Sequence, residues 1–343
     1  MRLLAARMAA ALPLIFCATI AVSADSAIDV SLGDVSLNKV AFLVAADNGI
    51  YQKNGLTIHQ FITKGAAARI SRSGINVPSE FVGTDDQDER APISIGGGSP
   101  LIVSMTTDAR STDRVIIATT DNQARFHVIS SKALNSVDDL KGKRLGFSSY
   151  GSVSHLMALE LLRQKGWSQD DDISLMEEGM AYSALKDGKV DAFIGSEIYY
   201  TMADKNDAKD LVNLTDYNIP LAGSGINVER KWLANHHDEV MRFVKSTIEA
   251  YALMKSDENV VRAVLAKWYG ITDARQQDDM YAQVVASPQK PYPAVDGIKL
   301  VKQLFSYREL KRRDADYFYD NSFVAELDKS GFIDKVYADP KAN

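Results

Sequence analysis

The fold class is indicated by residues 143–166, which read KRLGFSSYGSVSHLMALELLRQKG. Lys143 to Phe147 predicts a strand and Ser148 to Ser154 a loop rich in Gly and Ser. His155 to Lys165 predicts a helix, with leucines at helical spacing, that ends at Gly166. A strand, a loop and a helix in this order form the repeating unit of α/β proteins with parallel sheets.

The same alternation continues on both sides of this unit. Helices are predicted at Val40 to Asn48, after Pro100, at Ala181 to Asp187, and from Val240 to Tyr251, where one apolar stripe runs along a long helix. Strands are predicted at Leu56 to Phe61, Ala91 to Ile95, Arg114 to Thr119, Phe126 to Ser130 and Val190 to Ile194. We therefore expect an α/β protein with mostly parallel sheets flanked by helices.

The N-terminus has the pattern of a signal peptide over residues 1–24. Arg2 and Arg7 supply positive charge, and Met8 to Val22 is apolar but shorter than a membrane-spanning helix. Small residues at Ser23 and Ala24 predict cleavage before Asp25 and a periplasmic mature chain.

Two alternatives remain for this segment. The first is an uncleaved N-terminal anchor. The second is lipidation of Cys17, although the bulky Phe16 stands where a small residue is preferred. Because Cys17 is the one cysteine of the chain, the predicted mature protein carries no thiol.

The length and net charge of the chain indicate how many cores it can form and which partners it is suited to bind. The predicted mature chain of 319 residues is long enough for two hydrophobic cores. Its net charge of −8, against −6 for the whole chain, argues against a nucleic-acid partner and suits a soluble monomer. After the signal peptide we find no segment with the length and apolarity of a membrane span.

Four motifs carry a resemblance to a known family. They are Ala45 to Leu56 (AADNGIYQKNGL), Leu140 to Gly146 (LKGKRLG), Leu185 to Ala192 (LKDGKVDA), and Phe323 to Leu327 followed by Gly331-Phe332. In order and spacing they resemble the substrate-binding proteins of nitrate/sulfonate/taurine-type ABC importers. The chain is also similar to the branch that handles thiamine pyrimidine precursors.

The resemblance implies a type II periplasmic binding protein, with two lobes joined by a two-segment hinge and a ligand cleft between them. It implies lobe 1 at 25–122 and 221–343 and lobe 2 at 123–220, with crossings near Asp121 to Phe126 and Tyr217 to Gly223. The implied partners are a small-molecule ligand and the transmembrane subunits of an ABC permease. One segment departs from the family: Arg72 to Glu89 is polar and irregular, and we expect its acidic run from Asp85 to be a solvated loop.

Candidate ligand contacts lie at the carboxyl ends of the predicted strands, where loops lead into helix N-termini. A cluster of small donors after one strand exceeds what a helix cap needs, although capping alone is an alternative for each serine. The family resemblance adds two residues before the first helix. The candidates are Gly97, Gly98 and Ser99; Ser149, Tyr150, Gly151, Ser152 and Ser154; Ser196 and Glu197; and, from the resemblance, Ser36 and Asn38.

Catalytic and metal sites receive no support from the sequence. The five histidines are scattered, and we expect His155 to be structural. We therefore expect a binding protein without catalytic residues, cofactor or metal. The alternatives are an enzyme on the same fold that acts on a pyrimidine or thiamine precursor, which in that family uses cysteines absent from this mature chain, and the sensory domain of a receptor. The ligand itself stays open, because nitrate, sulfonates, aromatic acids and pyrimidines all suit such a cleft.

Overall fold

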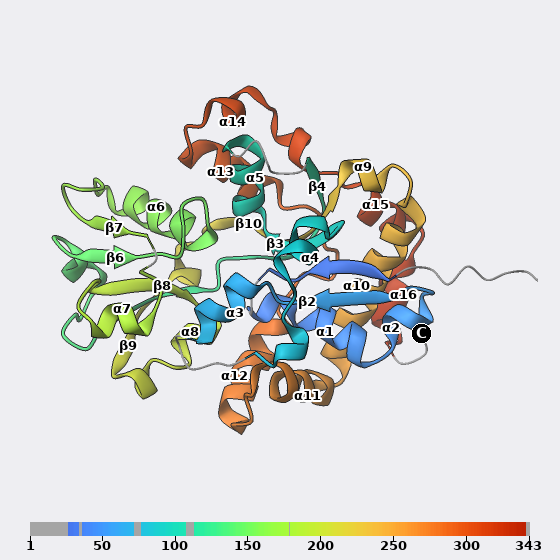
Figure 1. Ribbon diagram of the computed structural model, residues 1–343, viewed down its shortest axis with the longest axis horizontal. Coiled ribbons are helices and arrows are strands. Elements are labelled where there is room, and N and C mark those ends of the chain that lie inside the picture. The colour runs from blue at the N-terminus through green and yellow to red at the C-terminus, as the bar shows by residue number, and fades with distance from the viewer. Residues whose placement is uncertain (1–26, 34–35, 72–76, 108–112, 178, 341–343) are drawn as a thin grey trace, which may run out of the picture.

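The computed structural model describes residues 27–33, 36–71, 77–107, 113–177 and 179–340. Two five-stranded sheets, each flanked by helices, lie next to each other (Figure 1). We refer to the first sheet with its helices as lobe 1 and to the second as lobe 2. The predicted signal peptide, its cleavage site and Cys17 lie outside the described residues.

The sheet of lobe 1 has the strand order β2-β1-β3-β10-β4. Strand β10 alone is antiparallel to its neighbours, while β1 pairs in parallel with β2 and β3. Its strands are β1 (Ile28–Ser31), β2 (Ile58–Phe61), β3 (Ile93–Gly97), β4 (Arg114–Gln123) and β10 (Pro220–Glu229).

The sheet of lobe 2 repeats this arrangement in the order β7-β6-β8-β5-β9. Here β5 is the antiparallel strand, and β6 pairs in parallel with β7 and β8. Its strands are β5 (Phe126–Ser131), β6 (Arg144–Gly146), β7 (Ser174–Met176), β8 (Ala192–Ser196) and β9 (Ala208–Asn213). The prediction of two mostly parallel sheets in an α/β fold is confirmed.

The chain passes between the sheets twice. Strand β4 ends at Gln123 and β5 begins at Phe126, while β9 leads through the 3-10 helix η5 (Leu214–Tyr217) into β10. Because β4 and β10 pair with each other, both connections lie side by side. This is the arrangement of a two-segment hinge.

Helices cover both sheets. Lobe 2 contains α6 (Val153–Lys165), α7 (Tyr182–Lys186) and α8 (Glu197–Tyr200), with η3 (Val137–Leu140) and η4 (Asp204–Asn206). Lobe 1 contains α1 (Val40–Asp47), α2 (Ile50–Lys53), α3 (Lys64–Ser71), α4 (Asp85–Arg90), α5 (Gly98–Thr107), α9 (Arg230–Leu233), α10 (His237–Ser256), α11 (Glu258–Tyr269), α12 (Ala274–Val284), α13 (Val295–Leu304), α14 (Arg308–Arg312), α15 (Ser322–Lys329) and α16 (Phe332–Ala338), with η1 (Leu37–Lys39), η2 (Ser79–Phe81) and η6 (Ala315–Phe318). In the part of the chain that the structure describes, none of these helices has the length and apolarity needed to cross a membrane.

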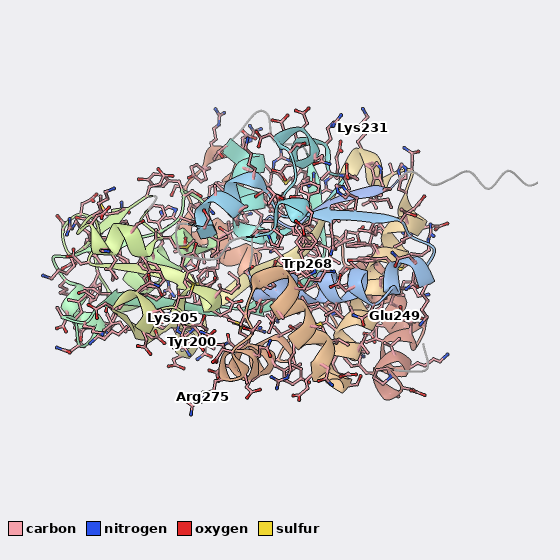
Figure 2. The ribbon with its side chains drawn as sticks, turned by 60° about the horizontal axis from the view of Figure 1, so that its bottom comes forward. Tyr200, Lys205, Lys231, Glu249, Trp268 and Arg275 are labelled. Carbon is pink, nitrogen blue, oxygen red and sulfur yellow. The ribbon has the colours of Figure 1, made fainter. Side chains whose placement is uncertain are left out.

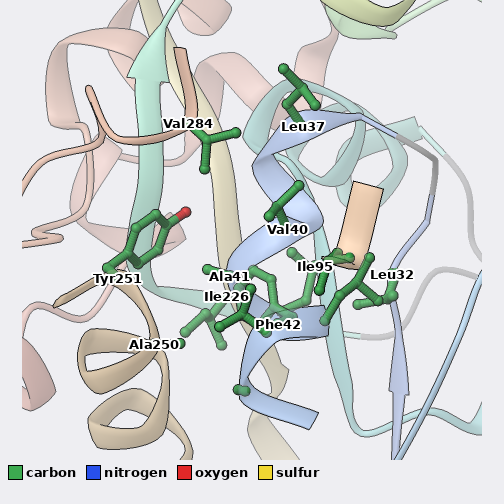
Figure 3. Close-up of a cluster of buried hydrophobic side chains, with 14 of the residues drawn as sticks. Leu32, Leu37, Val40, Ala41, Phe42, Ile95, Ile226, Ala250, Tyr251 and Val284 are labelled. Atoms are coloured by element: carbon green, nitrogen blue, oxygen red, sulfur yellow. The ribbon is translucent and has the colours of Figure 1, made fainter. Parts of the chain in front are cut away.

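Helix α1 lies at the centre of the lobe 1 core. Its Val40, Ala41 and Phe42 are fully buried, near Ile95 of β3 and Ile226 of β10 (Figure 3). On its other side α1 packs on α10. Apolar residues surround this helix, which explains why its sequence shows almost no polar face.

The prediction of a solvated loop from Asp85 to Glu89 is wrong, because these residues form α4. Thr84 caps the helix: its Oγ1 accepts from the backbone N–H of Gln87, and the Gln87 side chain accepts from the backbone N–H of Thr84. Acidic residues in the first turn are favourable at the positive end of the helix dipole. The acidic run therefore marks a helix start.

Candidate ligand-binding cleft

A cleft of about 1070 Å³ is lined by residues of both lobes. Lobe 1 contributes the ends of β1 and β3, the first residues before α1, and parts of α3, α4 and α5; lobe 2 contributes the loops after β6 and β8. Asp121, Arg125, Gly223 and Ser224 line it from the hinge strands and their connection. The volume lies just above the usual range for small-molecule pockets.

The cleft brings together most of the residues that the sequence proposes. Those that line it are Ser36, Asn38, Ser149, Tyr150, Ser152, Ser154, Ser196 and Glu197. Gly98, Ser99 and Gly151 lie outside the lining, and Gly97 is the last residue of β3. Gly98, Ser99 and Gly151 instead take part in the packing around the N-terminus of α5.

The N-terminus of α5 is packed against lobe 2 and the hinge. A Cβ atom on Gly98 would lie 2.6 Å from the Cβ of Ala222, so glycine permits this close approach. Ser99 is fully buried, and its Oγ donates to the carbonyl of Gly151 at 2.9 Å. Gly151 has a φ of +76° and lies against Val103 of α5. Ser99 and Gly151 therefore join the two lobes beside the cleft, while Gly98 allows α5 to pack closely on β10.

The serine loop from Ser148 to Ser154 starts α6. Ser152 is the N-cap, with its Oγ accepting from the N–H of His155 at 3.2 Å. Ser154 Oγ accepts from the N–H of Ser148 at 3.0 Å. Ser149 lines the cleft, and its hydroxyl makes no hydrogen bond within the described part of the chain. Ser149 is thus the hydroxyl of this loop that is available to a ligand.

Aromatic rings stand next to the serine loop. Tyr150 lines the cleft with 59% of its surface exposed and meets Phe147 and His155 edge-on. His155 stacks on Phe147, and its Nδ1 accepts from the N–H of Gly151 at 3.1 Å. Burial lowers the pKa of His155 to about 4, partly opposed by the charge of Glu177, so the imidazole is neutral at pH 7. These contacts support the structural role expected for His155.

The buried cation Lys39 lies beside Ser36 and Asn38, two of the ligand contacts expected from the sequence. Lys39 is 1% exposed, and its Nζ donates to Asn38 Oδ1 at 2.8 Å and to Ser224 Oγ at 2.9 Å. Ser36 Oγ also donates to Asn38 Oδ1, at 2.8 Å. Sequence reasoning missed Lys39, although a lysine directly before an apolar helix opposes the helix dipole and was a usable signal.

Two further charged residues that sequence reasoning missed come from the hinge. Arg125 and Asp121 are both buried, with Arg125 Nη2 at 3.4 Å from Asp121 Oδ1. They lie beside Glu197, whose Oε1 accepts from the N–H of Leu37 across the cleft at 3.0 Å. Burial raises the pKa of Glu197 to about 7; the charge of Arg125 opposes this rise and that of Asp121 adds to it.

Polar side chains also extend the cleft over the sheet of lobe 1. Ser31, Ser94 and Asn227 lie next to one another on paired strands and all line it. Arg114 Nε donates to Asn227 Oδ1 at 2.8 Å, and Ser31 Oγ donates to Asp88 Oδ1 of α4 at 2.6 Å. Helix α4 therefore supplies one wall of the cleft, and polar contacts hold it there.

The sequence of this chain is similar to those of known proteins. Residues 104–259 match the family model described as NMT1/THI5 like. A protein of Brachyspira hyodysenteriae described as an ABC transporter periplasmic binding protein is 29% identical over 200 residues, which are 57% of this chain and 54% of that protein. The chain spans about half the length of this curated relative.

Solved structures share the fold over most of both chains. The periplasmic nitrate-binding protein NrtA from Synechocystis PCC 6803 is 13% identical, with a TM-score of 0.69 over 92% of this chain and 91% of that one. The alkanesulfonate-binding protein SsuA from Xanthomonas axonopodis pv. citri, bound to MOPS, is 17% identical, with a TM-score of 0.61 over 84% and 98%. The desulfurization enzyme DSZB is 16% identical, with a TM-score of 0.59 over 89% and 100%. The chain therefore has the periplasmic binding protein fold, and its predicted resemblance to substrate-binding proteins of the nitrate and sulfonate type is confirmed.

Proposed function

We propose that this protein is the extracytoplasmic solute-binding component of an ABC importer. It captures a small polar or anionic organic solute, or an oxyanion, between its lobes and delivers it to the transmembrane subunits of a permease. The observation that carries this proposal is the cleft at the two-segment hinge, to which both lobes contribute hydroxyl, amide and charged groups. The comparisons with binding proteins of known name support it.

The proposed function also specifies where the protein works, which residues form each lobe, and that it acts as a monomer. The mature chain begins at Asp25, after export through the N-terminal signal peptide, and works in the periplasm as a monomer. Lobe 1 comprises 25–122 and 221–343, and lobe 2 comprises 123–220. Mass spectrometry of the protein recovered from the cell envelope tests this, because an intact N-terminus or a lipid on Cys17 contradicts it.

Enzymatic activity is the competing function, and the fold shared with a desulfurization enzyme is the observation that favours it. The arrangement at His155 argues against this imidazole as a base, because its Nδ1 already accepts a backbone hydrogen bond and its ring is stacked and buried. We therefore assign binding and release of an unchanged ligand.

A thermal-shift screen of the mature chain tests the proposed function. The panel contains oxyanions, sulfonates, carboxylates and pyrimidines, and a ligand at about 100 times its dissociation constant adds about 2.7 kcal/mol to the free energy of unfolding. Chromatography of the released compound then separates the two functions: recovery of the unchanged ligand supports a binding protein, and stoichiometric conversion supports an enzyme.

A further inference from the structure

Glu197 forms a contact between the lobes at the wall of the cleft. It is the first residue of α8 on lobe 2 and is 2% exposed, and its Oε1 accepts a hydrogen bond from the N–H of Leu37 on lobe 1 at 3.0 Å. Because Glu197 lines the cleft, separation of the lobes would break this hydrogen bond and bring the carboxyl group into contact with water. The position of the lobes therefore decides whether this group is buried or solvated.

The carboxyl group of Glu197 has few partners that would stabilise a negative charge. It makes no ion pair with any residue that the structure describes, and it meets the N–H of Leu37 and its own backbone N–H. An ionised carboxylate offers about four acceptor positions and loses strong hydration on burial. A protonated carboxyl group loses much less hydration and still offers its carbonyl oxygen to Leu37. Closure of the lobes thus favours the protonated form.

Charged groups of the hinge lie beside Glu197 and act on it in opposite directions. Arg125 favours the ionised form of Glu197, Asp121 opposes it, and these two buried residues lie 3.4 Å from each other. Burial outweighs both charges and raises the pKa of Glu197 to about 7. The other titratable groups around this contact are Lys39 on η1, Tyr269 on α11, Asp279 on α12, and Tyr200, His127 and Asp210 on lobe 2.

We propose that Glu197 couples closure of the lobes to the uptake of a proton, so that acid favours the closed conformation and alkaline pH favours the open one. This inference rests on the proposed function, because it assumes that the lobes move about the hinge, and it adds a regulation of that movement. A solute in the cleft is then held more firmly at acid pH and released more readily as the pH rises.

The direction of this effect follows from the two environments of the carboxyl group. In the open conformation water surrounds it and its pKa returns toward the ordinary 4.5, whereas burial in the closed conformation raises its pKa to about 7. The advantage of the closed conformation is therefore complete below pH 4.5 and is lost as the pH rises through about 7. Between pH 5 and pH 8 the ratio of closed to open protein should fall by roughly 10- to 100-fold.

His127 is the neighbouring group that the experiment has to separate from Glu197. Its ring stacks on Tyr200 with the ring centres 4.1 Å apart, and its Nδ1 lies 2.8 Å from Asp210 Oδ2. Tyr200 in turn accepts a hydrogen bond from Gln283 of α12 on lobe 1. Because histidine is the usual pH-sensitive side chain of proteins, His127→Gln is the matched control for a response that we assign to Glu197.

The test measures the distance between two spin labels in the ligand-free mature protein at pH 5, 6.5 and 8. The labels are placed on Lys205→Cys in lobe 2 and Arg275→Cys in lobe 1, which are both exposed positions (Figure 2). The measurement is repeated with Glu197→Gln, which keeps an oxygen for the N–H of Leu37 but does not titrate, and with His127→Gln. Glu197→Met is a second variant without a titratable group, in case the amide disturbs the contact.

Each variant is also measured together with Ser99→Ala. This substitution removes the hydrogen bond from Ser99 Oγ to the carbonyl of Gly151 on the other lobe. It therefore brings the equilibrium into the measurable range if one conformation dominates in the unmodified protein.

We expect the ratio of the short to the long distance to fall by roughly 10- to 100-fold from pH 5 to pH 8 in the unmodified protein and in His127→Gln. In Glu197→Gln and Glu197→Met the ratio should change by less than about twofold. A ratio that is independent of pH in both the Ser99 and the Ser99→Ala protein overturns the inference. A pH response that survives in the two Glu197 variants, or that is lost in His127→Gln, also overturns it.

Failure of this inference can be told apart from failure of the proposed function. The panel of oxyanions, sulfonates, carboxylates and pyrimidines is added to the same labelled protein at each pH. A compound that shortens the distance in a protein whose ligand-free ratio is independent of pH overturns the proton coupling and leaves the binding function in place. If no compound of the panel binds at any pH, the proposed function loses its support, while the ligand-free measurement still decides the proton coupling.

Discussion

At the scale of single residues, Glu197 and His155 give the stability of the protein two opposing dependences on pH. The pKa of Glu197 rises from 4.5 to about 7 on folding, so its contribution is complete below pH 4.5 and is lost as the pH rises through about 7. The pKa of His155 falls from 6.5 to about 4, so its contribution is complete above pH 6.5 and is lost as the pH falls toward 4.

Glu197→Gln should therefore gain stability relative to the unmodified protein as the pH rises from 4.5 to 7. The gain is about 3 kcal/mol over this interval, because the amide side chain of the variant does not titrate. His155→Gln should instead lose stability relative to the unmodified protein as the pH rises from 4 to 6.5. Urea unfolding at a series of pH values measures both differences, and parallel curves for variant and unmodified protein would contradict the buried, perturbed state of these groups.

The serine loop offers a second prediction about single residues. Ser152→Ala removes the N-cap of α6 and should cost about 1 kcal/mol of stability, whatever its effect on a ligand. Ser149→Ala should leave the stability nearly unchanged and lower ligand affinity by about 2- to 10-fold for a neutral partner, because its hydroxyl faces the cleft without a cap role. Calorimetry and thermal unfolding separate the two effects, with the exposed Ser256→Ala as control. Equal affinity in Ser149→Ala would exclude this hydroxyl from ligand contact.

At the scale of elements, the contact between α5 and the serine loop depends on Gly151. Any side chain there meets two obstacles: the φ of +76° is unfavourable for other residues, and a Cβ atom would lie 2.6 Å from Val103 Cγ1. The glycine is thus a packing requirement between lobes and does not line the cleft. Gly151→Val would therefore disturb the packing between the lobes as well as any ligand contact at this loop.

We expect Gly151→Val to lower the free energy of unfolding by roughly 2 kcal/mol or more. Gly65→Ala is the matched control, since Gly65 lies in α3 with nothing within 4 Å of an added Cβ, and it should raise stability by about 0.5 to 1 kcal/mol. Chemical unfolding measures both changes. A stable Gly151→Val protein with reduced ligand binding would show instead that the loop can shift to accommodate the side chain and that Gly151 is needed for ligand contact.

At the scale of the whole molecule, the lobes touch each other around the cleft. Besides the contacts of Ser99 and Glu197, helix α12 of lobe 1 bonds to α8 and the residue after it in lobe 2. Gln276 Nε2 donates to the carbonyl of Thr201 at 3.2 Å, and Gln283 Nε2 donates to Tyr200 Oη at 3.4 Å. Figure 2 shows Tyr200 beside α12, near the turn that carries Arg275. The structure therefore represents a conformation in which the lobes are in contact.

Ser99→Ala should shift the equilibrium of the ligand-free protein toward separated lobes by roughly fivefold, because it deletes one hydrogen bond between lobes worth about 1 kcal/mol. The predicted mature chain has no cysteine, so spin labels on Lys205→Cys and Arg275→Cys report one distance between the lobes. Both residues are exposed, one on each lobe (Figure 2). Ligand should shorten this distance. The control Ser256→Ala should not change the distance in the ligand-free protein. Identical distance distributions with and without ligand would argue against hinge closure.

The sequence by itself determined most elements and the fold class. Periodic apolar residues and glycine stops indicated α1, α6 and α10, and the Gly/Ser loop before α6 pointed to one wall of the cleft. These signals are local, since helix and strand patterns depend on residues a few positions apart. The acidic run of α4 has the composition of a solvated loop, but Thr84 and Gln87 form a capping box that starts a helix there.

Only the tertiary structure decided which polar residues meet in the cleft. Lys39, Asp121, Arg125 and Glu197 are spread over the chain, and they come together because β4 pairs with β10 in one sheet and β5 with β8 in the other. The pairing sets Asp121 opposite Ser224, which Lys39 contacts, and brings Glu197 to the N–H of Leu37. No local pattern encodes such contacts, because strand order and register follow from burying two whole cores at once.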